Sequence, residues 1–176
     1  MVAPVPRSSL VIGKCLGGAT VATIQGTILL SLAGLVHVPY SPLLIVTLLA
    51  EMALTAFTLT CFGVFAASRM QQVESFQVVM QLFVFPMFFL SGAVFPLTDL
   101  PRWLDVLTKI DPLTYAVDAI RRAILSRIRL GPGNSHLAQP VTWGHAVLPT
   151  GLELAIVAAV GAAFIAGAIA QFSRAE

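Results

Sequence analysis

Glu51 is the residue whose type and surroundings most suggest chemistry. It lies eight positions into a strongly apolar run from Leu43 to Ala67 that holds no other charged side chain. A charge inside such a run is costly, so an ionisable residue there is a functional candidate by default. Glu51 would then face a polar path and contact a cationic or polar molecule. The alternative is a structural carboxyl group that is protonated or bonded to Gln25, Thr47 or Thr55.

Gln25 and Gln81 are uncharged polar residues inside two other apolar runs. They are further candidates for lining such a path, although hydrogen bonds between helices are the commoner use of these side chains. Glu153 lies near the start of the last apolar run. We expect its carboxylate to reach the lipid headgroups.

The sequence has no pattern typical of a catalytic, metal or nucleotide site. Cys15 and Cys61 lack the paired spacing of a metal site or a disulfide framework, so we expect both to pack as small hydrophobic residues. The three histidines lack the His-x-x-x-His spacing of metal ligands. Neither a Gly-x-Ser-x-Gly elbow nor a Gly-x-x-x-x-Gly-Lys-Ser/Thr loop occurs. We therefore expect no enzymatic activity, no metal and no cofactor bound by this chain.

The composition is that of a membrane protein. Of the 176 residues, 57% are hydrophobic and 10% are charged, against roughly a quarter charged in an ordinary soluble domain. A spanning helix needs about 20 mostly apolar residues. Four such runs predict spans at about 15–36, 43–67, 76–96 and 147–172, and hence one all-α, polytopic membrane domain over 1–176. The net charge of +2, spread among loops, does not favour nucleic acid binding.

A pair of amphipathic helices is predicted in segment 97–146, between the last two spans. The first, Pro101–Ile110, is too short to cross a membrane. The second begins at Asp111, whose carboxylate can cap it, and at Pro112, which suits a first helical position. Its apolar residues recur at helical spacing as far as Ile128. We expect the pair to lie in the interface or to dip partly into the membrane against the other helices.

On the polar face of the second amphipathic helix, Asp118 reaches Arg122 across one turn. Together with Arg121, these residues are expected to form a solvated helix face. Ladders of small residues mark two of the spans and let other helices approach closely. They are Gly18, Ala22 and Gly26 in the first span, and in the last span Ala158, Ala162, Ala166 and Ala170 with, beside them, Ala159, Ala163 and Gly167.

The region after the third span carries a specific resemblance. It reads Phe85-Pro86-Met87-Phe88-Phe89-Leu90-Ser91-Gly92-Ala93-Val94-Phe95-Pro96-Leu97, then Leu100-Pro101-Arg102-Trp103-Leu104, then Asp111-Pro112-Leu113-Thr114-Tyr115-Ala116-Val117-Asp118-Ala119-Ile120-Arg121. This resembles the signature region of ABC-2 type transporter permeases, and the daunorubicin- and multidrug-resistance-like exporters most of all. The signature residues are Pro86, Gly92, Pro96, Pro101, Asp111, Pro112 and Tyr115.

The resemblance implies a multi-pass subunit of a bacterial plasma membrane exporter. Its partners would be a separate ABC ATPase, which binds and hydrolyses ATP, a second permease copy and membrane lipid. The cargo would be a drug-like or lipid-like amphipathic molecule. Family members have six spans, and this chain corresponds to the last four. Pro4 and Arg7 match the end of the family's cytosolic helix that engages the ATPase.

Two expectations depend on that resemblance. It makes 1–14 a cytosolic entry segment and 97–146 extracytoplasmic, although the basic residues of 97–145 oppose this orientation under the positive-inside rule. Because two family spans have no counterpart, the alternative function is a truncated, non-transporting membrane scaffold or partner subunit.

Overall fold

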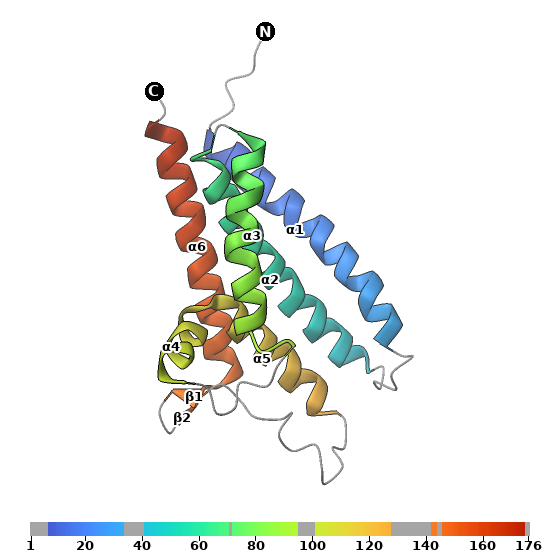
Figure 1. Cartoon of the computed structure of the whole chain (residues 1–176). Coiled ribbons are helices and arrows are strands. Elements are labelled where there is room, and N and C mark those ends of the chain that lie inside the picture. The colour runs from blue at the N-terminus through green and yellow to red at the C-terminus, as the bar shows by residue number, and fades with distance from the viewer. Residues whose placement is uncertain are drawn as a thin grey trace.

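The computed structural model describes residues 7–33, 41–70, 72–94, 101–127, 142–143 and 146–174. Its helices are α1 (Arg7–Ser31), α2 (Pro42–Ala67), α3 (Val73–Leu90), α4 (Arg102–Ile110), α5 (Pro112–Leu125) and α6 (Thr150–Arg174). Two short antiparallel strands, β1 (Thr142–Trp143) and β2 (Ala146–Val147), precede α6. The long helices run alternately in opposite directions, and both termini lie at one end of the bundle (Figure 1). The all-α membrane fold is confirmed.

Three helices of the described part, α2, α3 and α6, are long and apolar enough to cross a membrane. The helix α1 has 25 residues, about 38 Å at the usual rise, but polar residues interrupt its apolar run. Thr20, Thr23 and Thr27 each donate a hydroxyl to the carbonyl four residues earlier, at 2.7 to 2.8 Å. These bonds satisfy the hydroxyls inside the helix. That α1 is a fourth span stays a prediction, and residues 34–36 of its expected range lie outside the described residues.

The last two spans differ from their expected bounds for local reasons. The helix α3 ends at Leu90 instead of Pro96, because Ser91 donates its hydroxyl to the Phe88 carbonyl at 2.7 Å and Gly92 turns the backbone with a φ of 74°. The helix α6 starts at Thr150, where the Pro149 carbonyl accepts the first helical N–H groups. Residue 147, the expected start, belongs to β2.

The central helix is α2, which packs against both α1 and α6. A Cβ built on Gly18 would lie 2.6 Å from Thr60 Cγ2, and one on Gly161 would lie 2.8 Å from Thr58 Oγ1. Both distances are too short for a real side chain, so the helices approach this closely only because glycine stands there. Thr58 also donates its hydroxyl to the Val157 carbonyl of α6 at 3.1 Å. Close approach at glycine and this hydrogen bond therefore both help to hold α6 on α2.

The small-residue ladders have different outcomes. In α1, Gly18 and Gly26 face α2, as predicted. In α6, the predicted ladder Ala158, Ala162, Ala166 and Ala170 is exposed. Gly167 of the second predicted ladder does lie against α2, because a Cβ there would be 2.8 Å from Phe65 Cε2, and Gly161 lies against Thr58 of the same helix. The first ladder of α6 is therefore not the packing surface within this chain.

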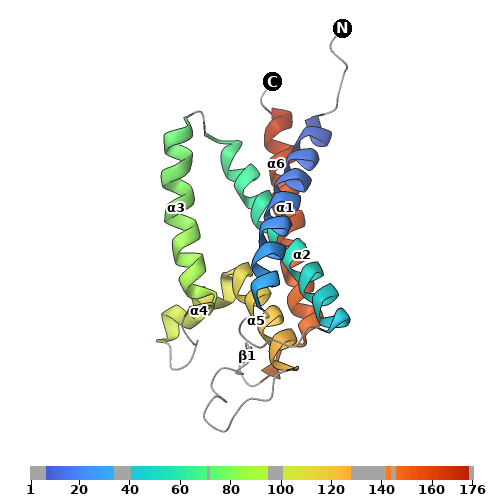
Figure 2. The same ribbon diagram turned by 90° about the vertical axis from the view of Figure 1, so that its right-hand side faces the viewer.

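The helix α3 stands away from the other long helices, as Figure 2 shows. All its described side chains are exposed or half-buried. It touches α2 through an edge-to-face contact between Phe62 and Phe83, whose ring centroids are 5.9 Å apart. At the end opposite to the termini, α4 and α5 close the bundle (Figure 1), and α5 packs against α2 and α6. Contact with the other helices, which belongs to one of the two predicted placements of the amphipathic pair, is present for α5, and the depth of the pair in the membrane stays a prediction.

Candidate functional site

The signature residues Asp111 and Pro112 start α5. Asp111 Oδ1 accepts the N–H of Leu113 at 2.9 Å, and Pro112 occupies the first helical position. Burial raises the pKa of the Asp111 carboxyl to about 6, although this N–H and the Thr114 hydroxyl act in the opposite direction. Thr114 donates to the Leu90 carbonyl at the end of α3, at 3.3 Å. The cap therefore fixes α5 at the point where it also meets α3.

Tyr115 joins α5 to two other segments. Its side chain is buried, its hydroxyl donates to the Lys109 carbonyl at the end of α4 at 2.6 Å, and it accepts the Trp143 indole N–H of β1 at 3.1 Å. Burial raises the pKa of the phenol. The hydroxyl is thus a fixed node between α4, α5 and the strand pair.

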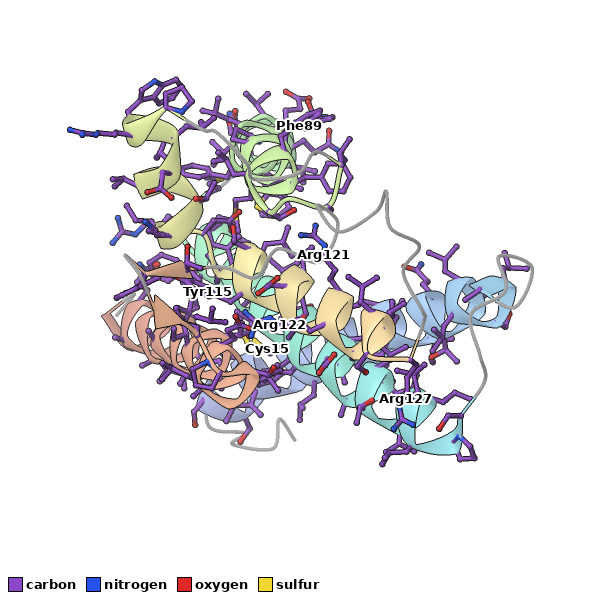
Figure 3. The ribbon with its side chains drawn as sticks, turned by 90° about the horizontal axis from the view of Figure 1, so that it is seen from below. Cys15, Phe89, Tyr115, Arg121, Arg122 and Arg127 are labelled. Carbon is purple, nitrogen blue, oxygen red and sulfur yellow. The ribbon has the colours of Figure 1, made fainter. Side chains whose placement is uncertain are left out.

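Arg121 and Arg122 leave α5 on different sides, as Figure 3 shows from below. Arg121 turns towards α3 and donates to the Gly92 carbonyl. Because Gly92 has a positive φ of 74°, a residue with a Cβ would be strained at this turn. Arg121 and Gly92 therefore form a second bond between α5 and the end of α3.

Arg122 points into the bundle and carries the densest polar network of the described residues. Its Nη2 lies 2.5 Å from Asp118 Oδ2 and 2.7 Å from Glu153 Oε1 of α6, and its Nη1 donates to the Leu148 carbonyl at 2.6 Å. The side chains of Asp118 and Glu153 are 2% and 0% exposed. The expectation of a solvated face for Asp118 and Arg122 was therefore wrong, as was that of a headgroup position for Glu153.

Glu51 lies beside this network. It is 7% exposed, and it interacts electrostatically with Glu153 across the contact between α2 and α6. Its Oε2 is buried and has no hydrogen-bond partner in the described part of the chain. Thr55 donates to the backbone carbonyl of Glu51 and not to its carboxyl, and Thr47 bonds only to carbonyls of its own helix turn. The structural alternative for Glu51 thus lacks the expected partners.

We call Glu51, Asp118, Arg122 and Glu153 the acid–arginine cluster. It gathers three buried carboxyl groups and one half-buried guanidinium from α2, α5 and α6. Sequence reasoning singled out Glu51 and the pairing of Asp118 with Arg122, but it missed that Glu153 belongs with them. In the sequence, the only signal for Glu153 is that it is an acid beside apolar residues. Its partner Arg122 lies 31 residues earlier on another helix, so no local pattern joins the two.

The other predicted path and coupling residues lie elsewhere. Gln25 and Gln81 are exposed, on α1 and α3, and neither bonds to Glu51. Arg7 begins α1, whereas Pro4 and the signature residue Pro96 lie outside the described residues. Pro86 lies inside α3, and the Pro101 carbonyl accepts the first N–H groups of α4, from Leu104 and Asp105.

The two cysteines meet, which their spacing in the sequence did not indicate. Cys15 of α1 and Cys61 of α2 are both fully buried, and their thiols are close enough to hydrogen bond. Apolar residues of α2 and α6 surround them. Buried thiols of this kind behave as structural hydrophobic groups. Among the described residues, no group of three or more His, Cys, Asp or Glu is placed to hold a metal ion.

The comparisons with known proteins agree with the signature. Residues 1–125 match the family described as ABC-2 type transporter. The chain belongs to the ABC-2 type transporter family. The match ends with the last residue of α5, so it includes every signature residue together with Glu51, Asp118 and Arg122. As a member of this family, the chain is a membrane component of a transporter.

Relatives of this ABC-2 type chain come from bacteria. Nodulation protein J of Sinorhizobium fredii (strain NBRC 101917 / NGR234) is 30% identical over 118 residues, which cover 67% of this chain and 45% of the relative. Nodulation protein J of Rhizobium meliloti (strain 1021) is 33% identical, over 66% of this chain and 44% of the relative. The Probable multidrug ABC transporter permease YbhR of Escherichia coli (strain K12) is 28% identical, over 71% and 34%.

The chain therefore spans less than half the length of these relatives. No solved structure matches it significantly. In this structure, several residues of the signature region tie α5 to its neighbours. Thr114 and Arg121 bond α5 to the end of α3, and Tyr115 bonds it to α4. The signature thus places the acid–arginine cluster against α6.

Proposed function

We propose that this chain is the membrane-spanning permease subunit of an ATP-driven exporter in a bacterial plasma membrane. A separate ABC ATPase binds and hydrolyses ATP, and a second permease copy completes the pathway. The cargo is a drug-like or lipid-like amphipathic molecule that leaves the cell. The observation that carries this proposal is the family match over 1–125. The name of the multidrug relative supports the cargo class.

The path for the cargo is proposed to pass Glu51, with Gln25 and Gln81 as further polar residues along it. Support for Glu51 comes from its buried, unpartnered carboxyl oxygen, which an arriving polar or cationic group would satisfy. The end of the bundle that holds both termini is proposed to face the cytosol and the ATPase. Arg7 starts α1 at that end (Figure 1), and Pro4 precedes it in the sequence.

The test is co-purification of the full-length protein with an ABC ATPase from the same membrane, followed by ATP hydrolysis measured with candidate amphipathic compounds. We expect a bound ATPase whose hydrolysis rate changes with an exported compound. Failure of the full-length protein to bind any ABC ATPase would refute the proposal. For the path, Glu51→Gln is compared with Glu74→Gln, an exposed acid in the first turn of α3. Unchanged export in a folded Glu51→Gln protein would remove Glu51 from the path.

The second candidate function is a non-transporting scaffold that binds partner helices. The exposed ladder of α6, Ala158, Ala162, Ala166 and Ala170, favours it, because small residues of this spacing pack against other helices in membranes. Substitution of Ala162 and Ala166 by leucine separates the two functions. If the chain is a scaffold, the double variant loses its partner protein, and neither form binds an ATPase. If the chain is a permease, it binds an ATPase whose hydrolysis rate responds to the cargo.

A further inference from the structure

The acid–arginine cluster has more acids than its single cation can balance. Glu51, Asp118 and Glu153 are three carboxyl groups, and among the described residues Arg122 is the basic side chain that bonds to Asp118 and Glu153. With all three ionised, three negative charges and one positive charge would give the cluster a net charge of −2. All three acids are at least nine-tenths buried. Uncompensated charge in such a place is strongly disfavoured.

The geometry at Asp118 and Glu153 indicates where the charge is compensated. Each acid gives one oxygen to the same Arg122 nitrogen, which brings the two carboxyl groups within hydrogen-bonding reach of each other. No donor reaches Glu153 Oε2 in the described part of the chain. Ionised carboxylates are acceptors only, so two of them form a hydrogen bond only when one holds a proton.

Glu51 is an independent indication that a positive charge is needed. It comes from a different helix, and its Oε2 is a buried oxygen without a donor next to Glu153. A metal ion does not fit, because no three acids of the described residues are arranged as ligands. An organic cation needs water-accessible room, and Glu153 at 0% exposure and Glu51 at 7% offer little in this packing of α2 against α6, so a cargo group would reach Glu51 only after these helices separate. A proton is the cation that needs no cavity.

We propose that the acid–arginine cluster is a proton-binding site, in which one proton is held between the carboxyl groups of Asp118 and Glu153 and keeps α5 docked on α6. This inference does not depend on the transport proposal. The other ionisable groups nearby are Tyr115 on α5, which interacts electrostatically with Glu153, and Lys109 and Asp111, which interact with Tyr115. Arg121 is turned away, towards Gly92.

Two measurements on the full chain in detergent micelles test the proposal. The first is the infrared band of a protonated carboxyl group at pH 7. The second is the number of protons released when sodium dodecyl sulfate unfolds the chain at pH 7 in weakly buffered solution, read with an indicator dye. We expect the band in the wild type and a release of at least one proton per chain, since an unfolded Asp or Glu is ionised at this pH. Both measurements are repeated in an Asp111→Asn, Glu51→Gln background, which removes the two buried carboxyl groups of the described residues outside the pair of Asp118 and Glu153 and should leave a release of about one proton.

The variants Glu153→Gln and Asp118→Asn imitate the protonated state, since an amide can donate the shared hydrogen bond. We expect each to lose the band and the proton release while α5 stays docked. Glu74→Gln, at an exposed position, should change neither. Absence of band and release in the wild type overturns the proposal, and this readout does not require any variant to fold. Loss of the band and the proton release in Glu51→Gln, with Asp118 and Glu153 intact, would overturn the proposal by placing the proton on Glu51. Loss of the band on addition of tetraphenylphosphonium would overturn it by showing an organic cation site.

Discussion

Replacing Arg122 with methionine should be among the most destabilising single substitutions in this chain. Methionine keeps an unbranched apolar stem but removes the guanidinium, which bonds to Asp118, Glu153 and the Leu148 carbonyl. The two acids, with side chains 2% and 0% exposed, would then lack their cation. Removing one partner of a buried ion pair costs about 3–5 kcal/mol, because a buried charge is left uncompensated. We expect a loss of that size in the free energy of unfolding.

The assay is unfolding by sodium dodecyl sulfate in mixed micelles, followed by circular dichroism. Arg127→Met is the matched control, since Arg127 follows the same helix and is exposed; surface changes of this kind stay within about 0.5 kcal/mol. The triple variant Arg122→Met, Asp118→Leu, Glu153→Leu should recover most of the loss, because apolar replacement of a whole buried ion network is often neutral. A loss below about 1 kcal/mol for Arg122→Met, or no recovery in the triple variant, would refute the reasoning.

Three further predictions concern the packing and the start of α5. Gly161→Ala should lower the free energy of unfolding by about 1–3 kcal/mol, because its Cβ would lie 2.8 Å from Thr58 Oγ1. Gly151→Ala is the control and should not destabilise the chain, because nothing lies near its Cβ. Unfolding in micelles measures both free energies. Asp111→Ala should lose about 0.5–2 kcal/mol of helix capping. Burial raises the pKa of Asp111 to about 6, so the folded state binds more protons than the unfolded state. The contribution of Asp111 to stability therefore falls as pH rises from about 4 to about 6. Asp111→Asn should remove this part of the pH dependence of stability, and an unchanged pH profile would contradict the prediction. Tyr115→Phe should cost about 0.5–1.5 kcal/mol, because it removes the hydrogen bonds of the Tyr115 hydroxyl to the Lys109 carbonyl and the Trp143 indole. Unaltered stability together with unaltered tryptophan fluorescence would contradict this role of the hydroxyl.

Much of the fold follows from the sequence because its signals are local. The apolar runs predict the long helices, since a chain in lipid must satisfy its backbone groups within each helix. Asp111 and Pro112 mark the start of α5 for a similar reason, because a cap involves only neighbouring residues. The C-terminal end of α3 and the start of α6 were less predictable. They depend on a serine hydroxyl, a glycine turn and a proline carbonyl within apolar sequence.

The candidate site was predictable only in part. Glu51 stands out in the sequence because a charge in an apolar run is rare, and Asp118 and Arg122 are neighbours on any helix. The sequence by itself therefore determined that this is an all-α membrane chain with the ABC-2 signature, and which acids are unusual. Only the tertiary structure decided that Glu153 of α6 closes on the Arg122 guanidinium and that α5 is buried at this face. The physical reason is that amphipathic periodicity gives the face of a helix but not its neighbour, and whether a polar face meets water or another charge depends on how the helices pack.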